Sequence, residues 1–267
     1  MDNRSDFLDF AINTAKKAGK LQMKYFGNIS SIKKKSTNID LLTDADKESE
    51  SFIINQIKSY YPTHSILSEE YGQTDNHSKY RWIIDPLDGT TNFVHKLPIF
   101  SVSMGLKKNN QTICAVVYNP AANKCFYAEI GKGSFLNDEK IKCSVNSSLS
   151  ESLLVTGFPY LHDKKYDLSF EIFKKFYDRT RGLRRLGAAS LDLCFIAMGR
   201  FDGFYEFALE PWDICAGVLI AQEAGAQVSD WNNAIWPESG ERILATNGYI
   251  HKEMVKILSN KIYKIFY

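Results

Sequence analysis

The chain has 267 residues, of which 44% are hydrophobic and 24% charged, ordinary values for a globular protein that exclude a disordered chain. Its 33 Lys and Arg residues against 31 Asp and Glu residues give a formal net charge of +2, so the charge balance does not indicate nucleic-acid binding. This length is near the upper limit for one hydrophobic core, and we expect one domain of two lobes, about 1–147 and 148–267.

The cysteines and the apolar runs bear on the compartment. Five cysteines are scattered singly without a Cys-x-x-Cys pair, which indicates reduced thiols in a cytosol. The N-terminal segment lacks the basic region and apolar run of a signal peptide, and no apolar stretch approaches the ~18 residues that a membrane span needs. We therefore expect a soluble, cytoplasmic protein without membrane contact.

The first elements in chain order are a helix and a basic segment. Apolar residues from Phe7 to Tyr25 recur at helical spacing and predict a helix over 6–26, which Gly27 ends. Lys33–Lys35 follow in a segment that we expect to be extended. A run of three lysines is ordinarily a solvated charge run, and one lysine at the border of a site could shield an incoming anion.

Two acidic positions follow at the edges of elements. Thr43 with acidic residues directly after it predicts the N-cap of a second helix, and Asp46 taken alone is a helix cap. Ser65–Ser68 predict a short strand that ends in Glu69-Glu70. Taken alone, these two glutamates are solvated loop charges.

The most informative segment is Trp82–Phe93, with the sequence WIIDPLDGTTNF. Three apolar residues predict a strand up to Asp85, and we expect Pro86 to end its ladder because proline has no amide hydrogen. Asp85 and Asp88 stand three positions apart around the Leu87 carbonyl, a set of oxygen ligands that suits a hard divalent cation such as Mg²⁺. The alternative is an Asx-type surface turn between two strands.

The remaining elements predict a β-rich first lobe and an alternating α/β second lobe. Strands are expected at Ile99–Leu106, Thr112–Tyr118, Cys125–Ala128, Ser134–Leu136, Asp202–Phe207 and Ile243–Thr246, and helices near 163–178, 189–199, 211–225 and 249–262. The third of these helices begins at Pro211 and carries Asp213 in its first turn, where the helix dipole favours negative charge.

The acidic residues share one kind of place, the end of a strand or the start of a helix. They are Asp46, Glu69, Glu70, Asp85, Asp88 and Asp213. Converging carboxylates repel one another unless metal ions neutralise them, so together they predict a metal site. Two metals about 3.5–4 Å apart can hold both the attacking and the leaving oxygen of an in-line displacement.

Two long motifs in this chain resemble signatures of a known family. Trp82–His95 and Trp212–Gly225 are similar to the two signatures of the inositol monophosphatase family, the Mg²⁺-dependent, lithium-sensitive sugar phosphatases. Thr43-x-x-Asp46 and Glu69-Glu70 stand at the expected distances upstream, and the similarity runs over about residues 5–250.

Shorter segments refine this resemblance. Gly157-Phe158-Pro159 and Arg184–Ala189 look most like the bacterial inositol-1-monophosphatases. One departure is Ala226, where a second glycine usually follows Gly225. This departure affects a turn beside a helix end and leaves the acidic residues intact.

The resemblance implies a role for each site residue. The expected metal ligands are Glu69, Asp85, the Leu87 carbonyl, Asp88 and Asp213. The expected catalytic residues are Asp46, which reaches a metal through water or at a weaker third site, and Glu69 and Thr90, which orient a metal-bound water. The expected substrate-binding residues are Glu69, Leu87, Asp88, Gly89, Thr90, Arg184, Glu206 and Asp213. Within this set the amides of Gly89 and Thr90 face the phosphate, Arg184 and Glu206 face the sugar hydroxyls, and Glu70 is expected behind the ligands.

The resemblance also implies the fold and the reaction. It predicts a layered α-β-α-β-α sandwich with a metal-site lobe and a substrate lobe, two or three Mg²⁺ ions, a homodimer, and hydrolysis of inositol 1-phosphate or a similar polyol phosphate by direct attack of water. A related phosphatase for fructose 1,6-bisphosphate, histidinol phosphate or a nucleotide 3′-phosphate keeps the same metal ligands. The same resemblance is compatible with a regulatory protein that binds RNA or the transcription machinery, and with an inactive homologue.

Overall fold

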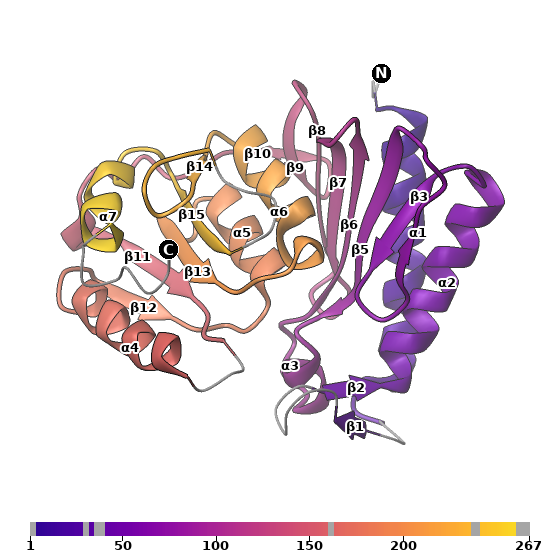
Figure 1. Cartoon of the computed structure of the whole chain (residues 1–267), viewed down its shortest axis with the longest axis horizontal. Helices are drawn as coiled ribbons and strands as arrows, with labels where there is room; N and C mark the ends of the chain where they lie inside the picture. The colour runs from indigo at the N-terminus through magenta and orange to yellow at the C-terminus, as the bar shows by residue number, and fades with distance from the viewer. Residues whose placement is uncertain (1–3, 29–31, 35–40, 160–162, 236–240, 260–267) are drawn as a thin grey trace.

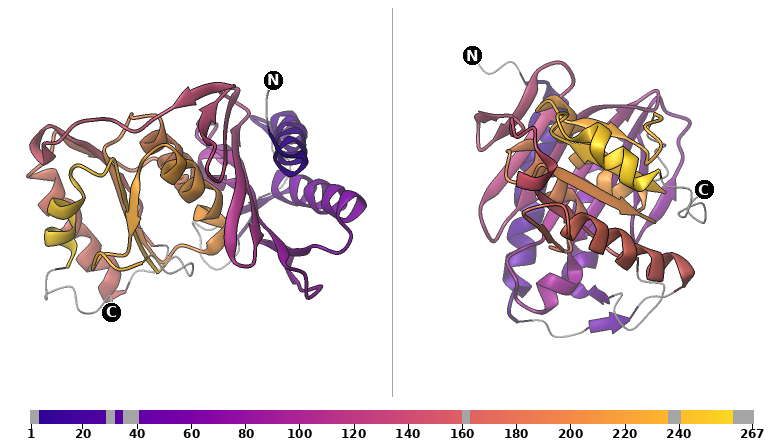
Figure 2. Two further views of the ribbon diagram at one scale, coloured as in Figure 1. Left: turned by 90° about the horizontal axis from the view of Figure 1, so that it is seen from above. Right: turned by 90° about the vertical axis from the view of Figure 1, so that its left-hand side faces the viewer.

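Helices and sheets alternate in five layers, α-β-α-β-α, in the computed structural model of the chain, which describes residues 4–28, 32–34, 41–159, 163–235 and 241–259 (Figure 1). Figure 2 shows the same layers from above: α1 (Asp6–Tyr25) and α2 (Asp44–Tyr60) outside the larger sheet, α5 (Ala189–Ala197) and α6 (Pro211–Glu223) between the sheets, and α4 (Lys164–Tyr177) and α7 (His251–Leu258) outside the smaller sheet. The fold class expected from the sequence is confirmed. The lobe boundary at residues 147 and 148 stays a prediction, and the two central helices pack against both sheets.

The helices and strands have the following bounds. The helices are α1 (Asp6–Tyr25), α2 (Asp44–Tyr60), α3 (Thr90–Val94), α4 (Lys164–Tyr177), α5 (Ala189–Ala197), α6 (Pro211–Glu223) and α7 (His251–Leu258), with a 3-10 turn η1 (Leu149–Glu151). The strands are β1 (Ile32–Lys34), β2 (Leu41–Thr43), β3 (Ser65–Ser68), β4 (Gly72–Thr74), β5 (Tyr80–Asp88), β6 (Ser101–Lys108), β7 (Gln111–Asn119), β8 (Lys124–Glu129), β9 (Gly133–Leu136), β10 (Glu139–Ile141), β11 (Leu153–Thr156), β12 (Gly182–Arg184), β13 (Gly203–Phe207), β14 (Gln227–Ser229) and β15 (Arg242–Thr246).

The larger sheet has eight strands in the order β10-β9-β8-β7-β6-β5-β3-β4. Its strands from β5 to β10 form an antiparallel meander within the β-rich first lobe that the sequence predicted. β3 runs parallel to β5, and Ser68 pairs with Ile84. Glu69, the residue after β3, therefore lies next to Asp85 of β5 at the same end of the two strands.

The central strands of this sheet are buried on both faces, because helices cover both. Val102 and Met104 of β6 pack with the apolar face of α1 and α2. Ala115 and Val117 of β7 belong to the cluster that contains α5 and α6. Successive side chains of a strand point to opposite faces of the sheet. Because both faces are covered here, both sets of side chains are apolar, and the central strands read as nearly continuous apolar runs.

The end of β5 differs from the prediction that Pro86 stops the strand. β5 continues to Asp88, and its pairing with β6 shifts between Asp85↔Ser103 and Asp88↔Ser101. Three steps on β5 thus oppose two on β6, which is a β-bulge. The bulge places Pro86, which cannot donate to the ladder, at the irregular position, and it turns the following residues out of the sheet.

The smaller sheet has the order β12-β11-β13-β15-β14. β11 pairs in parallel with β12 and β13, and β15 is antiparallel to β13 and β14. α4 and α7 cover its outer face, with Ile172, Phe176 and Met254 in their core (Figure 1). β11, β12 and β14 were not predicted, and the end of the helix expected over 249–262 lies outside the described residues.

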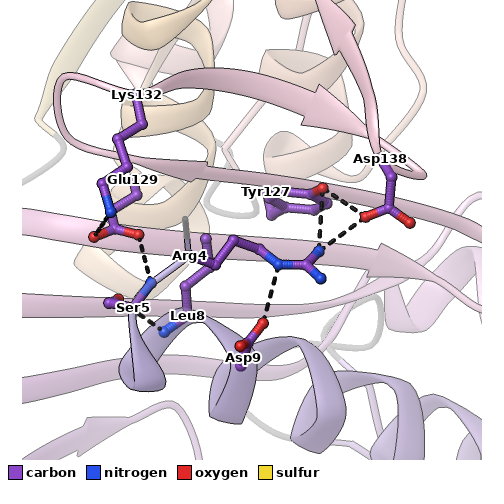
Figure 3. Close-up of polar contacts among 8 residues, drawn as sticks. All are labelled: Arg4, Ser5, Leu8, Asp9, Tyr127, Glu129, Lys132 and Asp138. Carbon is purple, nitrogen blue, oxygen red and sulfur yellow. Dashed lines mark hydrogen bonds and ion pairs between the residues drawn. The ribbon is translucent and has the colours of Figure 1, made fainter. Parts of the chain in front are cut away.

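The start of α1 is fixed to the larger sheet by a polar cluster (Figure 3). The Ser5 side chain caps the helix and its amide donates to Glu129 Oε2 at 3.0 Å. The Arg4 guanidinium lies 2.8 Å from Asp138 Oδ1 and 3.0 Å from Asp9 Oδ1. These contacts bind the first turn of α1 to the β8–β10 region.

The cysteine and membrane expectations concern the chain as a whole. All five cysteines are buried free thiols. Among the helices in the described part of the chain, none combines the length and the apolar character that crossing a membrane requires.

Candidate active site

A cavity of about 420 Å³ opens where the end of β5 faces the N-termini of α5 and α6 and the end of β13. Of the residues predicted for the site, it is lined by Glu69, Asp85, Leu87, Asp88, Gly89, Thr90, Glu206 and Asp213. Asp46 and Arg184 do not line it. The fold thus brings most of the predicted site residues to one place from both halves of the sequence.

Asp85 and Leu87 are oriented by the bulge at the end of β5. Asp85 is 2% exposed, and its Oδ1 accepts a hydrogen bond of 2.9 Å from the Leu87 amide. The hydroxyl of Thr90 lies 3.1 Å from the Leu87 carbonyl oxygen. The turn therefore presents a carboxylate and a carbonyl from neighbouring positions, as the sequence motif predicted.

Asp88 is held by the second half of the chain. Its Oδ2 accepts hydrogen bonds from the Ser190 amide at 2.9 Å and the Ser190 hydroxyl at 2.5 Å. The Ser190 hydroxyl is also 2.9 Å from that of Ser101 on β6. Ser190 lies in the first turn of α5, where free amides and the helix dipole favour a carboxylate. Sequence reasoning missed this contact because it joins positions that are far apart in the chain.

Gly89 directly follows the bulge and precedes α3. Its φ of 90° lies in the left-handed region, and a Cβ there would be 2.8 Å from the Ile99 carbonyl oxygen, so only glycine fits. Thr90 begins α3, whose first amides have no partner within the helix. The role of the Gly89 and Thr90 amides as phosphate ligands stays a prediction.

Asp46 lies behind Thr90 and not in the cavity wall. Its Oδ1 is 3.1 Å from the Thr90 hydroxyl, and its Oδ2 accepts from the Thr43 amide at 2.8 Å and the Thr43 hydroxyl at 2.5 Å. Asp46 is fully buried, and with Thr43 it forms the capping box of α2. Asp46 therefore caps α2, as predicted, and also lies next to the cavity. It contacts the cavity lining through its hydrogen bond with the Thr90 hydroxyl.

Asp213 enters the site from the first turn of α6. Its Oδ2 accepts a hydrogen bond of 2.7 Å from the amide of Glu210, the N-cap, and Pro211 occupies the first helical position. The helix start predicted from Pro211 is confirmed. This cap directs the Asp213 carboxylate toward the cavity that Asp85 and Asp88 line from the other side.

The acidic residues raise one another's pKa. Burial raises the pKa of Asp85 well above its usual value, and the carboxylates of Glu69, Asp88 and Asp213 raise it further. Burial likewise raises the pKa of Asp88 to about 6, although the Ser190 hydroxyl and amide oppose the shift. Burial, with the neighbouring acids, raises the pKa of Asp213 well above its usual value. Such a cluster favours either protons or a cation.

Glu206 on β13 forms the opposite wall. It is 9% exposed, and burial raises its pKa to about 8. A Cβ on Gly157 would lie 1.9 Å from Glu206 Oε1, so a glycine at 157 makes room for this carboxyl. Asp192 of α5 also lines the cavity and is 1% exposed, and its Oδ1 has no hydrogen-bond partner among the described residues.

The structure corrects the expected arginine. Arg184 at the end of β12 and Arg185 after it are both exposed, and the Arg184 guanidinium donates to the Leu183 carbonyl at 2.9 Å without lining the cavity. Arg185 lines the cavity instead, and its charge opposes the raised pKa values of Asp88, Asp192 and Glu206. Adjacent residues at a strand end point to opposite faces of the sheet, so only one of Arg184 and Arg185 can point to the cavity.

Two other expectations have partial answers. Glu70 lines the cavity together with Glu69. Its expected position behind the metal ligands stays a prediction. Lys33 and Lys34 form part of β1, as the extended segment predicted, while Lys35 and the side chains of Lys33 and Lys34 lie outside the described atoms.

The donor set fits a hard divalent cation. In the part of the chain that the structure describes, no three His, Cys, Asp or Glu side chains converge closely enough to hold a metal by themselves. Mg²⁺, however, takes one or two carboxylates and completes its octahedron with waters and substrate phosphate. A carbonyl oxygen at Leu87, buried carboxylates at Asp85 and Asp88, and the raised pKa values of these two acids suit this kind of ion.

Comparison with known proteins identifies the family. A sequence model of the inositol monophosphatase family matches residues 3–263. The chain belongs to this family. The putative Nus factor SuhB of Neisseria meningitidis serogroup B is 44% identical over 259 residues, which cover 95% of this chain and 98% of that protein. The fructose-1,6-bisphosphatase/inositol-1-monophosphatase of Thermotoga maritima is 36% identical over 260 residues, with 97% and 98% covered.

The solved structures agree with this assignment. The inositol monophosphatase from Anabaena superposes with a TM-score of 0.84 at 39% identity, covering 95% of each chain. The resemblance read from the two sequence signatures is therefore confirmed, and family membership identifies the chain as a phosphatase of a metal-dependent family.

Proposed function

We propose that this inositol monophosphatase family member hydrolyses the phosphate monoester of a polyol, inositol 1-phosphate or a similar sugar phosphate, with Mg²⁺ as cofactor. The observation that carries the proposal is the cavity itself, in which Asp85 and Asp88 from one half of the chain meet Asp213 and the hydroxyl-binding candidate Glu206 from the other half. Glu69, Asp85, the Leu87 carbonyl, Asp88 and Asp213 are the proposed ligands of two or three ions. Bound Mg²⁺ lowers the pKa of a coordinated water and neutralises phosphate charge.

Thr90 and Asp46 are the proposed positioning pair for the attacking water. When the Thr90 hydroxyl donates to Asp46 Oδ1, 3.1 Å away, the Thr90 oxygen is left to accept a hydrogen bond from water. Glu69 is the second group proposed to orient this water. A bond then forms from the water oxygen to phosphorus while the bond from phosphorus to the sugar oxygen breaks, with inversion, because no residue in the cavity is proposed to form a phosphoenzyme.

The second wall favours a neutral polyol. A carboxyl whose pKa is raised, as at Glu206, can both donate to and accept from sugar hydroxyls near neutral pH. Glu206, Glu210 and Asp192 also line the cavity, and these carboxyl groups offer no positive charge to a second phosphate, which disfavours a bisphosphate substrate. The alternative substrates are fructose 1,6-bisphosphate, histidinol phosphate and nucleotide 3′-phosphates. The name of the Thermotoga relative includes fructose-1,6-bisphosphatase, which supports the first of these alternatives.

A second function is proposed from the relatives alone. The protein from Neisseria meningitidis carries the name putative Nus factor SuhB. We propose association with RNA or the transcription machinery as an additional role. Co-purification of this chain with RNA polymerase from its own cells, set against a variant without phosphatase activity, tests whether the two roles are separate.

The test of the main proposal is release of inorganic phosphate from a panel of the substrates named above. Activity should vanish after EDTA treatment, return with Mg²⁺ and be inhibited by Ca²⁺, which is larger and more loosely coordinated. Asp88→Asn should lower kcat by on the order of 10²–10³, the usual loss for a group that stabilises transition-state charge. Asp138→Asn, which changes an exposed carboxylate beside Arg4, is the matched control.

Several outcomes would contradict this proposal. Full activity in metal-free buffer removes the metal assignment, and so does a wild-type rate in Asp88→Asn. Preference for fructose 1,6-bisphosphate over inositol 1-phosphate replaces the substrate. Two properties implied by the resemblance are measured alongside: inhibition by Li⁺ in the millimolar range and a homodimer in light scattering.

A further inference from the structure

One turn of α2 presents three buried polar side chains to the proposed site. Asp46, Ser49 and Glu50 are 0%, 0% and 7% exposed. Residues spaced by three and four positions lie on one face of a helix, so these side chains share a face. Such a face is ordinarily apolar when it is buried, and burying polar groups is costly unless each is hydrogen-bonded.

Each of these side chains contacts a different segment of the site. Asp46 receives the Thr90 hydroxyl. The Ser49 hydroxyl donates to the Pro86 carbonyl at 3.0 Å, and thus supports the bulge between Asp85 and Asp88.

Glu50 contacts the third segment, the turn between β3 and β4. Its Oε1 accepts from the Ser68 hydroxyl at 2.5 Å, from the Glu70 amide at 3.0 Å and from the Tyr71 amide at 2.8 Å. The residue between these donors is Glu69, which lines the cavity, whereas Glu50 itself does not. Charge-assisted hydrogen bonds of this kind are roughly twice as strong as neutral ones, which suits a group that must hold a tight turn.

We propose that Glu50 is a positioning residue for Glu69. By fixing the backbone on both sides of Glu69, it keeps that carboxylate directed into the cavity, and it thereby sets the affinity for Mg²⁺. The inference rests on the proposed function, since it assumes that Glu69 is a metal ligand. Partners that orient metal ligands typically change metal affinity or activity 10–100-fold when they are removed.

The test compares Glu50→Ala, Glu50→Asp and Glu50→Gln. Ala removes the acceptor, Asp keeps the charge but shortens the reach by one methylene, and Gln keeps an acceptor oxygen at the same reach. We expect Ala and Asp to raise the Mg²⁺ concentration for half-maximal activity at least about tenfold. The KM for substrate at saturating Mg²⁺ should change less, and Gln should restore most of the wild-type value.

Two readouts do not depend on activity. Titration calorimetry with Mg²⁺ alone should show the same loss of affinity in Glu50→Ala and Glu50→Asp. Hydrogen exchange should be faster at the Glu70 and Tyr71 amides of these variants than in the wild type. Glu48→Ala is the matched control, because Glu48 is exposed on the same helix and contacts the Tyr25 hydroxyl instead.

The outcomes separate the two proposals. If Glu50→Asp folds and keeps wild-type Mg²⁺ affinity and wild-type exchange at Glu70 and Tyr71, the positioning role is overturned. It is also overturned if the melting temperature falls in all three variants while the Mg²⁺ dependence stays unchanged, since Glu50 is then only structural. A wild-type protein without Mg²⁺-dependent phosphatase activity overturns the proposed function instead, and the exchange experiment still reports on the turn.

Discussion

Single carboxylates in this site are oriented by donors close to them in the chain. Asp85 accepts from the amide two residues later, and Asp213 from the amide three residues earlier. Each of these bonds uses one carboxylate oxygen and stabilises the charged form, while burial opposes it. Burial prevails in both, because the pKa of each is raised. A cation that replaces the missing solvation therefore favours the ionised form of both acids.

The two adjacent arginines provide a matched test at this scale. Both side chains are exposed, but Arg185→Ala removes a positive charge that lines the cavity with Glu206, whereas Arg184→Ala removes one that does not line it. We expect Arg185→Ala to change kcat/KM for inositol 1-phosphate about tenfold or more, with a smaller effect on a generic aryl phosphate. Arg184→Ala should stay within about twofold of the wild type for both, as surface substitutions usually do. Steady-state kinetics on both substrates decides between them, and a larger effect from Arg184→Ala would restore the assignment made from sequence.

Elements that arise from local patterns were predictable, and those that depend on distant pairing were not. The N-cap at Thr43 and the helix start at Pro211 follow from residues within one helical turn, and both are confirmed. The bulge after Asp85 depends on which residues of β6 oppose β5, a fact that no local pattern contains. The short parallel strand β11 is stabilised by neighbours about thirty and fifty residues away along the chain, so its own four residues carry little signal.

The same distinction holds for the site. Asp85, Leu87 and Asp88 were predictable because one turn brings their oxygens together. Ser190 was not, because α5 reaches Asp88 only through the packing of the two halves of the chain. Asp192, which follows Ser190 in the first turn of α5, was missed for the same reason.

The N-terminus of α5 should therefore tune the metal site. Ser190→Ala removes the hydroxyl donor to Asp88 and its contact with Ser101, but leaves the Ser190 amide in place. Losing a donor to the charged form raises the pKa of Asp88, so Mg²⁺ must compete with a more tightly held proton. We expect the acid limb of the pH–rate profile to move to higher pH and the melting temperature to fall modestly. Ser190→Thr, which keeps the hydroxyl, should retain the wild-type limb, and an unmoved limb in Ser190→Ala would contradict the role.

The whole molecule has a formal net charge of only +2, yet eight acidic residues line one cavity between the two halves of the chain. Residues 69–90 supply one wall and residues 185–213 the other, so repulsion between carboxylates acts across the junction of the two sheets. Metal binding relieves that repulsion, and we expect it to stabilise the folded chain as well as to activate it.

The pH dependence of stability without metal follows from this arrangement. Burial raises the pKa of Glu206 from 4.5 to about 8, so the folded protein keeps a proton that the unfolded chain has lost above about pH 4.5. The free energy of unfolding must then fall as pH rises toward 8, by up to ~1.4 kcal/mol per pH unit for each such proton. His251, whose pKa burial lowers to about 4, gives the opposite slope, but only below its usual value of 6.5.

The measurement is therefore made from pH 6.5 to 8, by melting the protein in EDTA and again in Mg²⁺. We expect the melting temperature in EDTA to fall across this range and the fall to be smaller in Mg²⁺, because the metal competes with protons for the carboxylates of the cavity. Glu206→Gln should flatten the EDTA curve, since the amide does not titrate, while Glu171→Gln on the exposed face of α4 should leave it unchanged. A melting temperature that rises between pH 6.5 and 8 without metal would mean that the acids of the cavity are already ionised in the folded chain. Burial and mutual repulsion of these acids would then not explain why the site needs a cation.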